Sequence, residues 1–158
     1  MPEPLTDQII RKIQEVVELY HRLMIVAAPS GSGKTAALQE VSKRTGHLRI
    51  NVNLELSRRL LDLTERQRTL SLPRLLGEIV GEAKSDVVLL DNIEILFDIS
   101  LKLDPLRLLQ NISRNKTLVA AWNGSIARGH LVYATPDHPE YRRYPLRDFL
   151  IVNPETIA

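Results

Sequence analysis

The sequence predicts an α/β fold in which helices cover both faces of a mainly parallel, five-stranded sheet. Short apolar runs at 23–27, 87–90 and 117–122 are typical of buried strands. Segments with apolar residues three or four positions apart, as in 5–20, separate the strands and indicate amphipathic helices. Strands that alternate with helices usually form parallel sheets, because each helix crosses over one face of the sheet. We therefore expect a three-layer sandwich.

The individual elements follow from periodicity and from helix-breaking residues. The expected helices are 5–20 with Thr6 as the N-cap, 35–43, 54–82 with a break around Leu72-Pro73, and 105–113; the expected strands are 23–27, 48–53, 87–90, 117–122 and 149–152. The segment 123–148 departs from this alternation and contains Pro136, Pro139 and Pro145. Within it, 131–133 is expected to add an edge strand.

Length and composition limit the class of protein. A chain of 158 residues with 44% hydrophobic and 25% charged residues fits one globular domain, with a lead-in helix over 1–21 and a core over 22–152. The net charge of +2 is too small to indicate nucleic-acid binding. The absence of cysteine excludes disulfides and zinc–thiolate sites. No signal peptide is visible, and the longest apolar run, 23–29, is too short to span a membrane, so we expect a cytoplasmic protein.

The segment Ala28-Pro29-Ser30-Gly31-Ser32-Gly33-Lys34-Thr35 has the pattern of a phosphate-binding P-loop. The two glycines let the backbone curl so that N–H groups point inward, and the following helix directs the positive end of its dipole at an anion. Lys34 is expected to reach the β- and γ-phosphates, and the Thr35 hydroxyl to bind magnesium. The expected ATP-binding residues are Pro29, Ser30, Gly31, Ser32, Gly33, Lys34, Thr35 and Ala36.

Polar residues that follow two other strands are candidates for the rest of a magnesium–ATP site. Asp91 follows the apolar strand 87–90 and is expected to hold magnesium together with Thr35. Asn92 can orient a water molecule but cannot accept its proton, whereas Glu94 can serve as the base or lie in solvent at a helix start. Asn123 can sense the γ-phosphate, or can belong to an Asn123-Gly124 turn.

Together these residues resemble the AAA+ ATPases, a subgroup of the P-loop NTPases. Residues 28–35 resemble Walker A, 87–91 resemble Walker B, and Asn123 lies where sensor 1 is expected; the usual first glycine of Walker A is Ala28 here. The resemblance implies a ring-like homo-oligomer in which a neighbour's arginine completes the site. Arg142 and Arg143 lie in the interval where this arginine is expected, and Arg128 is a weaker candidate. The chain ends about where the helical lid of these ATPases would begin, so the resemblance implies weak hydrolysis by the isolated chain.

Over its whole length the sequence resembles the small P-loop protein of type 3 BREX phage-defence systems, the BrxF family. The similar features are the short lead-in helix, the A-P-S-G-S-G-K-T loop, the L-L-D-N-I-E block and the W-N-G sequence. This resemblance implies a role beside other phage-defence proteins in a complex that restricts phage DNA.

Other functions remain open at the level of sequence. A GTPase is disfavoured because Asn115-Lys116 precedes its strand instead of following it. A small-molecule kinase would need an arginine-rich lid, for which Arg58, Arg59, Arg66 and Arg68 are the candidates. A nucleotide-binding scaffold without hydrolysis would explain Asn92. Direct DNA contact is suggested only by the basic and aromatic residues of 141–144.

Overall fold

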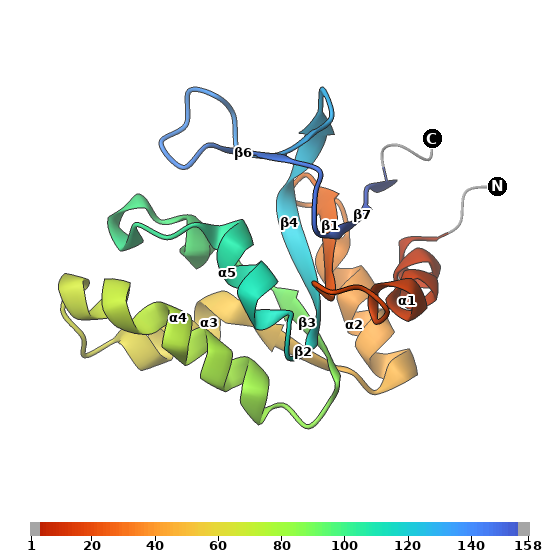
Figure 1. Ribbon diagram of the computed structural model, residues 1–158, viewed down its shortest axis with the longest axis horizontal. Coiled ribbons are helices and arrows are strands. Elements are labelled where there is room, and N and C mark those ends of the chain that lie inside the picture. Colours follow the sequence, from red (N-terminus) through yellow and green to blue (C-terminus); the bar gives the residue numbers. More distant parts are fainter. Residues whose placement is uncertain (1–3, 155–158) are drawn as a thin grey trace.

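The computed structural model describes residues 4–154 and contains a sheet whose central part is parallel (Figure 1). The parallel strands lie in the order β2-β3-β4-β1-β7. Their bounds are β1 Leu23–Ala28, β2 Leu48–Asn51, β3 Val87–Asp91, β4 Thr117–Ala127 and β7 Leu150–Val152. The predicted α/β fold class is therefore confirmed, and β4 separates the loop strand β1 from β3.

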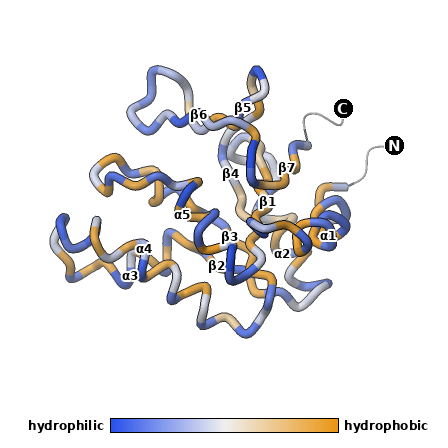
Figure 2. Tube along the Cα trace, in the orientation of Figure 1, coloured by the Kyte–Doolittle hydropathy of each residue, from blue (hydrophilic) through white to orange (hydrophobic). Residues whose placement is uncertain are grey.

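Helices cover both faces of this sheet (Figure 1). On one face lie α1 (Leu5–Val16) and α2 (Lys34–Thr45); on the other lie α3 (Val52–Leu60), α4 (Glu65–Glu82), α5 (Pro105–Ile112) and the 3₁₀ turns η1 (Glu94–Phe97) and η2 (Ile99–Leu101). Alternate residues of β1 enter different cores, because side chains of a strand alternate between faces. Figure 2 shows the matching alternation of hydrophobic and hydrophilic residues along α1 and α4.

Strand β4 is longer than predicted and continues past the parallel sheet. Its last four residues, 124–127, pair antiparallel with β5 (His130–Tyr133), which pairs in turn with β6 (Arg142–Pro145). We call these three segments the antiparallel extension. With β5 and β6 the sheet has seven strands within the described residues, whereas the sequence predicted five and an added edge strand over 131–133. Strand β6 was not predicted.

Gly124 permits the close pairing of β4 with β5. A Cβ atom at this position would lie 1.8 Å from the carbonyl oxygen of Val132. That oxygen also accepts a hydrogen bond of 3.1 Å from Nε1 of Trp122. The ring of Trp122 is fully buried and makes edge contacts with Phe97, Tyr133 and Tyr144. The extension is therefore fixed to the core by packed aromatic rings.

Several predicted helix boundaries were wrong. Helix α1 ends at Val16 instead of residue 20, and its N-cap is Pro4, without a side-chain cap, instead of Thr6. Strand β2 ends at Asn51, because the side chain of Asn51 accepts a hydrogen bond from the backbone of Leu54 and thereby starts α3 at Val52.

The helical segment 54–82 is broken at a different place from the one predicted. The break covers 61–64, where Thr64 and Gln67 form a capping box that starts α4. Pro73 lies inside α4, between the buried residues Leu72 and Leu76. A proline removes one backbone hydrogen bond, and here the packing of the helix against the core outweighs that loss.

None of the helices in the described part of the chain is both long enough and apolar enough to cross a membrane.

Candidate nucleotide-binding site

A pocket of about 350 Å³ lies where β1 and β3 end and β4 leaves the parallel part of the sheet. In parallel α/β sheets this carboxyl edge is where ligands bind. The lining residues come from the loop after β1, from the end of β3 and from β4: Ser30, Gly31, Gly33, Lys34, Thr35, Asp91, Asn92, Glu94, Ala121 and Asn123. The pocket therefore brings together the loop, Asp91, Asn92, Glu94 and Asn123.

The backbone of the loop has the curled conformation that the two glycines allow. Gly31 has φ +80° and Gly33 has φ +94°, values that residues with a side chain rarely adopt. Gly33 is also the N-cap of α2, and its carbonyl oxygen accepts from the N–H of Ala37. The amide groups before Ala37 have no acceptor within the helix, so they are available to an anion.

Lys34 is folded back onto the loop that precedes it. Its Nζ donates hydrogen bonds to the carbonyl oxygens of Ala28 at 2.6 Å and Pro29 at 2.8 Å, and lies 3.4 Å from Oγ of Ser32. Burial lowers the pKa of Lys34 below its usual value, while the nearby Asp91 and Glu94 act in the opposite direction. The contact with Ala28 uses only its backbone, so alanine in place of the usual glycine leaves it unaffected.

Asp91 is buried and holds three donors. Its Oδ1 accepts from the hydroxyl of Thr35 at 3.2 Å and from the backbone N–H of Asn92 at 3.0 Å. Its Oδ2 lies 3.2 Å from NH1 of Arg49. Asn92 adopts a left-handed conformation, with φ +53°, that turns the chain away from β3. The structure thus places the two predicted magnesium ligands, Thr35 and Asp91, in direct contact.

Glu94 is held between two asparagine side chains. Its Oε1 accepts from Nδ2 of Asn123 at 2.7 Å, and its Oε2 accepts from Nδ2 of Asn53 at 2.9 Å. Glu94 is the first residue of η1, as the alternative of a glutamate at a helix start expected, but its half-buried side chain lines the pocket instead of lying in solvent. The alternative of an Asn123-Gly124 turn was wrong too, because β4 continues through both residues.

Arg49 and Asn53 were missed at the sequence level. Asn53 ties α3 to the segment after β3, since its backbone N–H donates to Asn92 and its Oδ1 accepts from the backbone of Ile95. Arg49 belongs to β2, which pairs with β3. The only signal in the sequence was polar residues around the end of a strand, and the sequence does not tell which strand is its neighbour.

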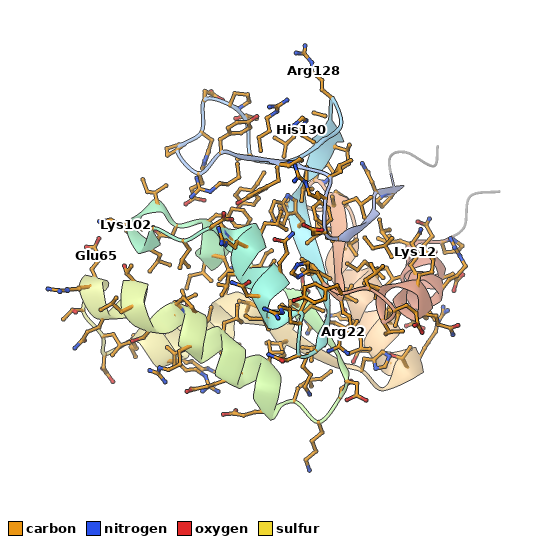
Figure 3. The ribbon with its side chains drawn as sticks, in the orientation of Figure 1. Lys12, Arg22, Glu65, Lys102, Arg128 and His130 are labelled. Atoms are coloured by element: carbon orange, nitrogen blue, oxygen red, sulfur yellow. The ribbon has the colours of Figure 1, made fainter. Side chains whose placement is uncertain are left out.

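Other predicted site residues are not among those that line the pocket. Pro29, Ser32 and Ala36 are exposed and are not among the residues that line it. Arg142 and Arg143 are in β6, where Arg142 bonds to the backbone of Leu103 and Arg143 to the ring of His130. Arg128 projects from the tip of the β4–β5 hairpin (Figure 3). The arginines considered for a kinase lid, Arg58, Arg59, Arg66 and Arg68, do not line the pocket either.

The residues present fit a magnesium nucleotide. The loop supplies an ammonium group and free amide groups for phosphates, and Thr35 and Asp91 offer oxygen atoms of the kind that magnesium prefers. Within the described residues, no three or more histidine or acidic side chains lie close enough together to hold a metal ion by themselves. A magnesium site in this pocket would therefore use oxygen atoms of the nucleotide in addition to those of the protein.

Comparisons with known proteins found similar structures but no matching sequence family. No protein-family model matches the chain, and no curated protein matches it. AMPPCP-bound DnaA from Aquifex aeolicus is similar with a TM-score of 0.41 and 16% identity, over 73% of this chain and 36% of DnaA. PCH-2 of C. elegans is similar with a TM-score of 0.47 and 16% identity, over 95% of this chain and 41% of PCH-2. The chain thus spans less than half the length of either protein.

Proposed function

We propose that this chain is a magnesium–ATP-binding, AAA+-like ATPase subunit that hydrolyses ATP weakly alone and faster in an assembly. The observation that carries the proposal is the meeting of Lys34, Thr35, Asp91 and Glu94 in one pocket. Lys34 and Thr35 come from the loop and α2, and the two acidic residues lie at and after the end of β3. Each residue type matches one need of phosphoryl transfer: phosphate charge, metal and water.

Lys34 and the loop bind the phosphates in this proposal. The ammonium group exchanges its bonds to the carbonyl oxygens of Ala28 and Pro29 for bonds to phosphate oxygens, which are stronger acceptors. The amide groups at the start of α2 add further donors. Thr35 and Asp91 would hold magnesium, which when bound neutralises phosphate charge.

Glu94 is the proposed base for the attacking water. Each of its oxygen atoms accepts one amide hydrogen bond, and a carboxylate oxygen can accept a second. Glu94 can therefore be held in place by Asn53 and Asn123 and still accept a proton from water. Asn92, which also lines the pocket, can orient that water through its amide group.

The proposal includes a homo-oligomer in which Arg142 or Arg143 acts on the site of a neighbouring subunit. Both residues lie in the antiparallel extension and outside their own pocket, which agrees with a role in trans. Arg128 at the hairpin tip is a third candidate for this role. The sequence resemblance to the BrxF family supports a place among cytoplasmic phage-defence proteins of the type 3 BREX kind, with DNA as a more distant contact.

Nucleotide binding is tested by titrating a fluorescent ATP analogue with magnesium into the wild type, Lys34→Ala and Lys43→Ala. Lys43 is a matched control, because it is an exposed lysine near the other end of the same helix. We expect Lys34→Ala to weaken binding by about 100-fold, as loss of a buried charge contact does, and Lys43→Ala to bind as the wild type does. Equal affinity of Lys34→Ala and the wild type would contradict the proposal.

The ATPase is distinguished from its alternatives by phosphate release at increasing protein concentration, with sedimentation in parallel. The proposal predicts that release per subunit rises with concentration together with a nucleotide-dependent increase in mass. Binding without release at any concentration would favour the scaffold. Turnover that appears only after a small acceptor molecule is added would favour the kinase.

A further inference from the structure

Within residues 4–154, the only ion pair of Asp91 is the one with Arg49, and no part of the proposed reaction uses it. Its NH1 lies 3.2 Å from Oδ2 of Asp91. The side chain of Asp91 is 4% exposed, whereas that of Arg49 is 29% exposed. The pair therefore joins a buried carboxylate of the pocket to a guanidinium group that is still in contact with water.

The sheet register brings the two residues together. Strand β2 is parallel to β3, with Arg49 opposite Leu89 and Asn51 opposite Asp91. Arg49 therefore lies two residues before the position opposite Asp91, on the same face of the sheet. A long side chain such as that of arginine can span that diagonal.

The two carboxylate oxygens of Asp91 accept hydrogen bonds from different groups. Oδ1 accepts from Thr35, the other candidate magnesium ligand, and from the backbone of Asn92. Oδ2 accepts from Arg49. A positive charge bound to Oδ2 competes electrostatically with a magnesium ion for the same carboxylate.

Arg49 also changes the charge that a nucleotide meets. The ionisable groups that line the pocket are the cation Lys34 and the anions Asp91 and Glu94. Arg49 lies outside the lining but pairs with Asp91, so the formal charges of these four groups cancel. Without Arg49 the site would carry an excess negative charge. A nucleotide without magnesium would then be repelled, and a magnesium ion would be attracted.

We propose that Arg49 is a positioning residue that acts as a built-in counter-cation for Asp91 and sets how strongly nucleotide binding depends on magnesium. While Arg49 neutralises Asp91, the pocket holds a nucleotide even without the metal, and magnesium gains less from Asp91 than it otherwise would. This inference rests on the proposed nucleotide site and adds a specific role for a residue outside the P-loop.

The test compares the dissociation constant of a fluorescent, non-hydrolysable ATP analogue in excess EDTA with that in excess magnesium. The ratio of the constant in EDTA to the constant in magnesium is measured for the wild type, Arg49→Gln, Arg49→Lys and Arg59→Gln. Arg59 is the matched control, since it is another arginine beside the same edge of the sheet and pairs with Glu82 instead of Asp91. A change in the ratio reports on magnesium coupling, which a purely structural ion pair would leave unaltered.

We expect Arg49→Gln to raise the ratio by about tenfold, mainly by weakening binding in EDTA, because couplings between linked sites are commonly of this size. Arg49→Lys keeps the charge and should stay near the wild type, as should Arg59→Gln. Equal ratios in Arg49→Gln and Arg59→Gln would overturn the inference. If the wild type binds the analogue in neither buffer, the nucleotide site itself is wrong, which is a different result.

Melting curves without nucleotide show whether the variants fold. If Arg49→Gln does not fold, Arg49→Met replaces it, because methionine keeps an aliphatic stem against the sheet while removing the charge. If neither variant folds, the Arg49–Asp91 pair is structural and the inference is overturned.

Discussion

The nucleotide pocket and the antiparallel extension meet on β4 but are held together by different interactions. In the pocket, polar side chains from separate elements bind one another, as Glu94 does with Asn53 and Asn123. At the base of the extension, the rings of Tyr133 and Tyr144 pack together with that of Phe97 from η1 around Trp122 of β4. Trp122 and Asn123 are adjacent in sequence, yet Trp122 packs in the aromatic cluster whereas Asn123 lines the pocket.

This difference suggests that function and stability can be changed separately in this chain. Half-buried polar groups of the pocket such as Glu94 can be replaced by isosteres at little cost to the fold, because the apolar cores lie on either side of the sheet. Aromatic groups in the extension contribute their buried area to stability and are not among the residues that line the pocket. The predictions below test this separation.

The largest expected effect is that of Glu94→Gln on hydrolysis. An amide cannot accept the proton of water, so phosphate release should fall by about 10²–10⁴-fold, the usual contribution of a general base. Nucleotide affinity and melting temperature should remain close to those of the wild type. Glu78→Gln is the control, because Glu78 is an exposed residue of α4 paired with Arg74. Full phosphate release by Glu94→Gln would exclude Glu94 as the base.

Replacing Trp122 by alanine should affect stability more than any single change in the pocket. It removes a fully buried ring and the hydrogen bond to Val132, at a cost of about 3–5 kcal/mol in the free energy of unfolding. Urea denaturation followed by circular dichroism measures this cost. Trp122→Phe, which keeps a ring but loses the hydrogen bond, should cost less. A loss below about 1 kcal/mol in Trp122→Ala would contradict the assignment of the aromatic cluster as a stabilising element.

Two glycine-to-alanine substitutions should change the stability of the protein in opposite directions. Gly124→Ala places a Cβ against the backbone of Val132 and should destabilise the protein by about 1–3 kcal/mol, the usual cost of overpacking. Gly77→Ala lies inside α4 with nothing within 4 Å of the new Cβ, so it should stabilise by about 0.5–1 kcal/mol. Thermal melting of both variants is the measurement. A Gly124→Ala variant that is as stable as the wild type would show that β4 and β5 are less closely paired than described.

The smallest expected effect is a loss of stability at high pH that arises in the extension. Burial raises the pKa of Tyr133 to about 12, and burial also raises the pKa of Tyr144, which donates its hydroxyl hydrogen to Asp104. A raised pKa means that the folded state favours the neutral phenol, so this contribution is complete below the unfolded pKa of about 10. It is lost as pH rises from about 10 to 12.

Tyr133→Phe should flatten the fall in the free energy of unfolding over that pH range, because phenylalanine has no group to ionise. Tyr20→Phe is the control, since Tyr20 is 70% exposed and lies outside the extension. An equal pH dependence in both variants would show that Tyr133 does not contribute to it.

The parts of the site that could be predicted from the sequence are those formed by residues that follow one another in the chain. The loop 28–35 and the strand that ends at Asp91 carry their own local patterns, and the structure brings them to one pocket. Arg49 and Asn53 could not be predicted in the same way, because their roles depend on the pairing of β2 with β3. That pairing joins residues about 40 positions apart and has no local signature.

The errors in the prediction of the fold have a similar origin. Pro73 indicates a helix end when taken alone, yet the packing of α4 carries the helix through it. Asn123-Gly124 is a common turn pair, but the approach of β5 requires glycine inside a strand at that position. In both cases a tertiary contact outweighed the local preference.

The central claim, that nucleotide phosphates bind the loop after β1, is tested most directly by NMR of the labelled chain. Backbone amide resonances are followed while magnesium and a non-hydrolysable ATP analogue are added. We predict saturable shifts at 30–36 and 91–94 and at Asn123, with much smaller shifts in β5 and β6. Shifts that are largest in the antiparallel extension, or on the face formed by α4 and α5, would contradict the account, as would the absence of any saturable shift.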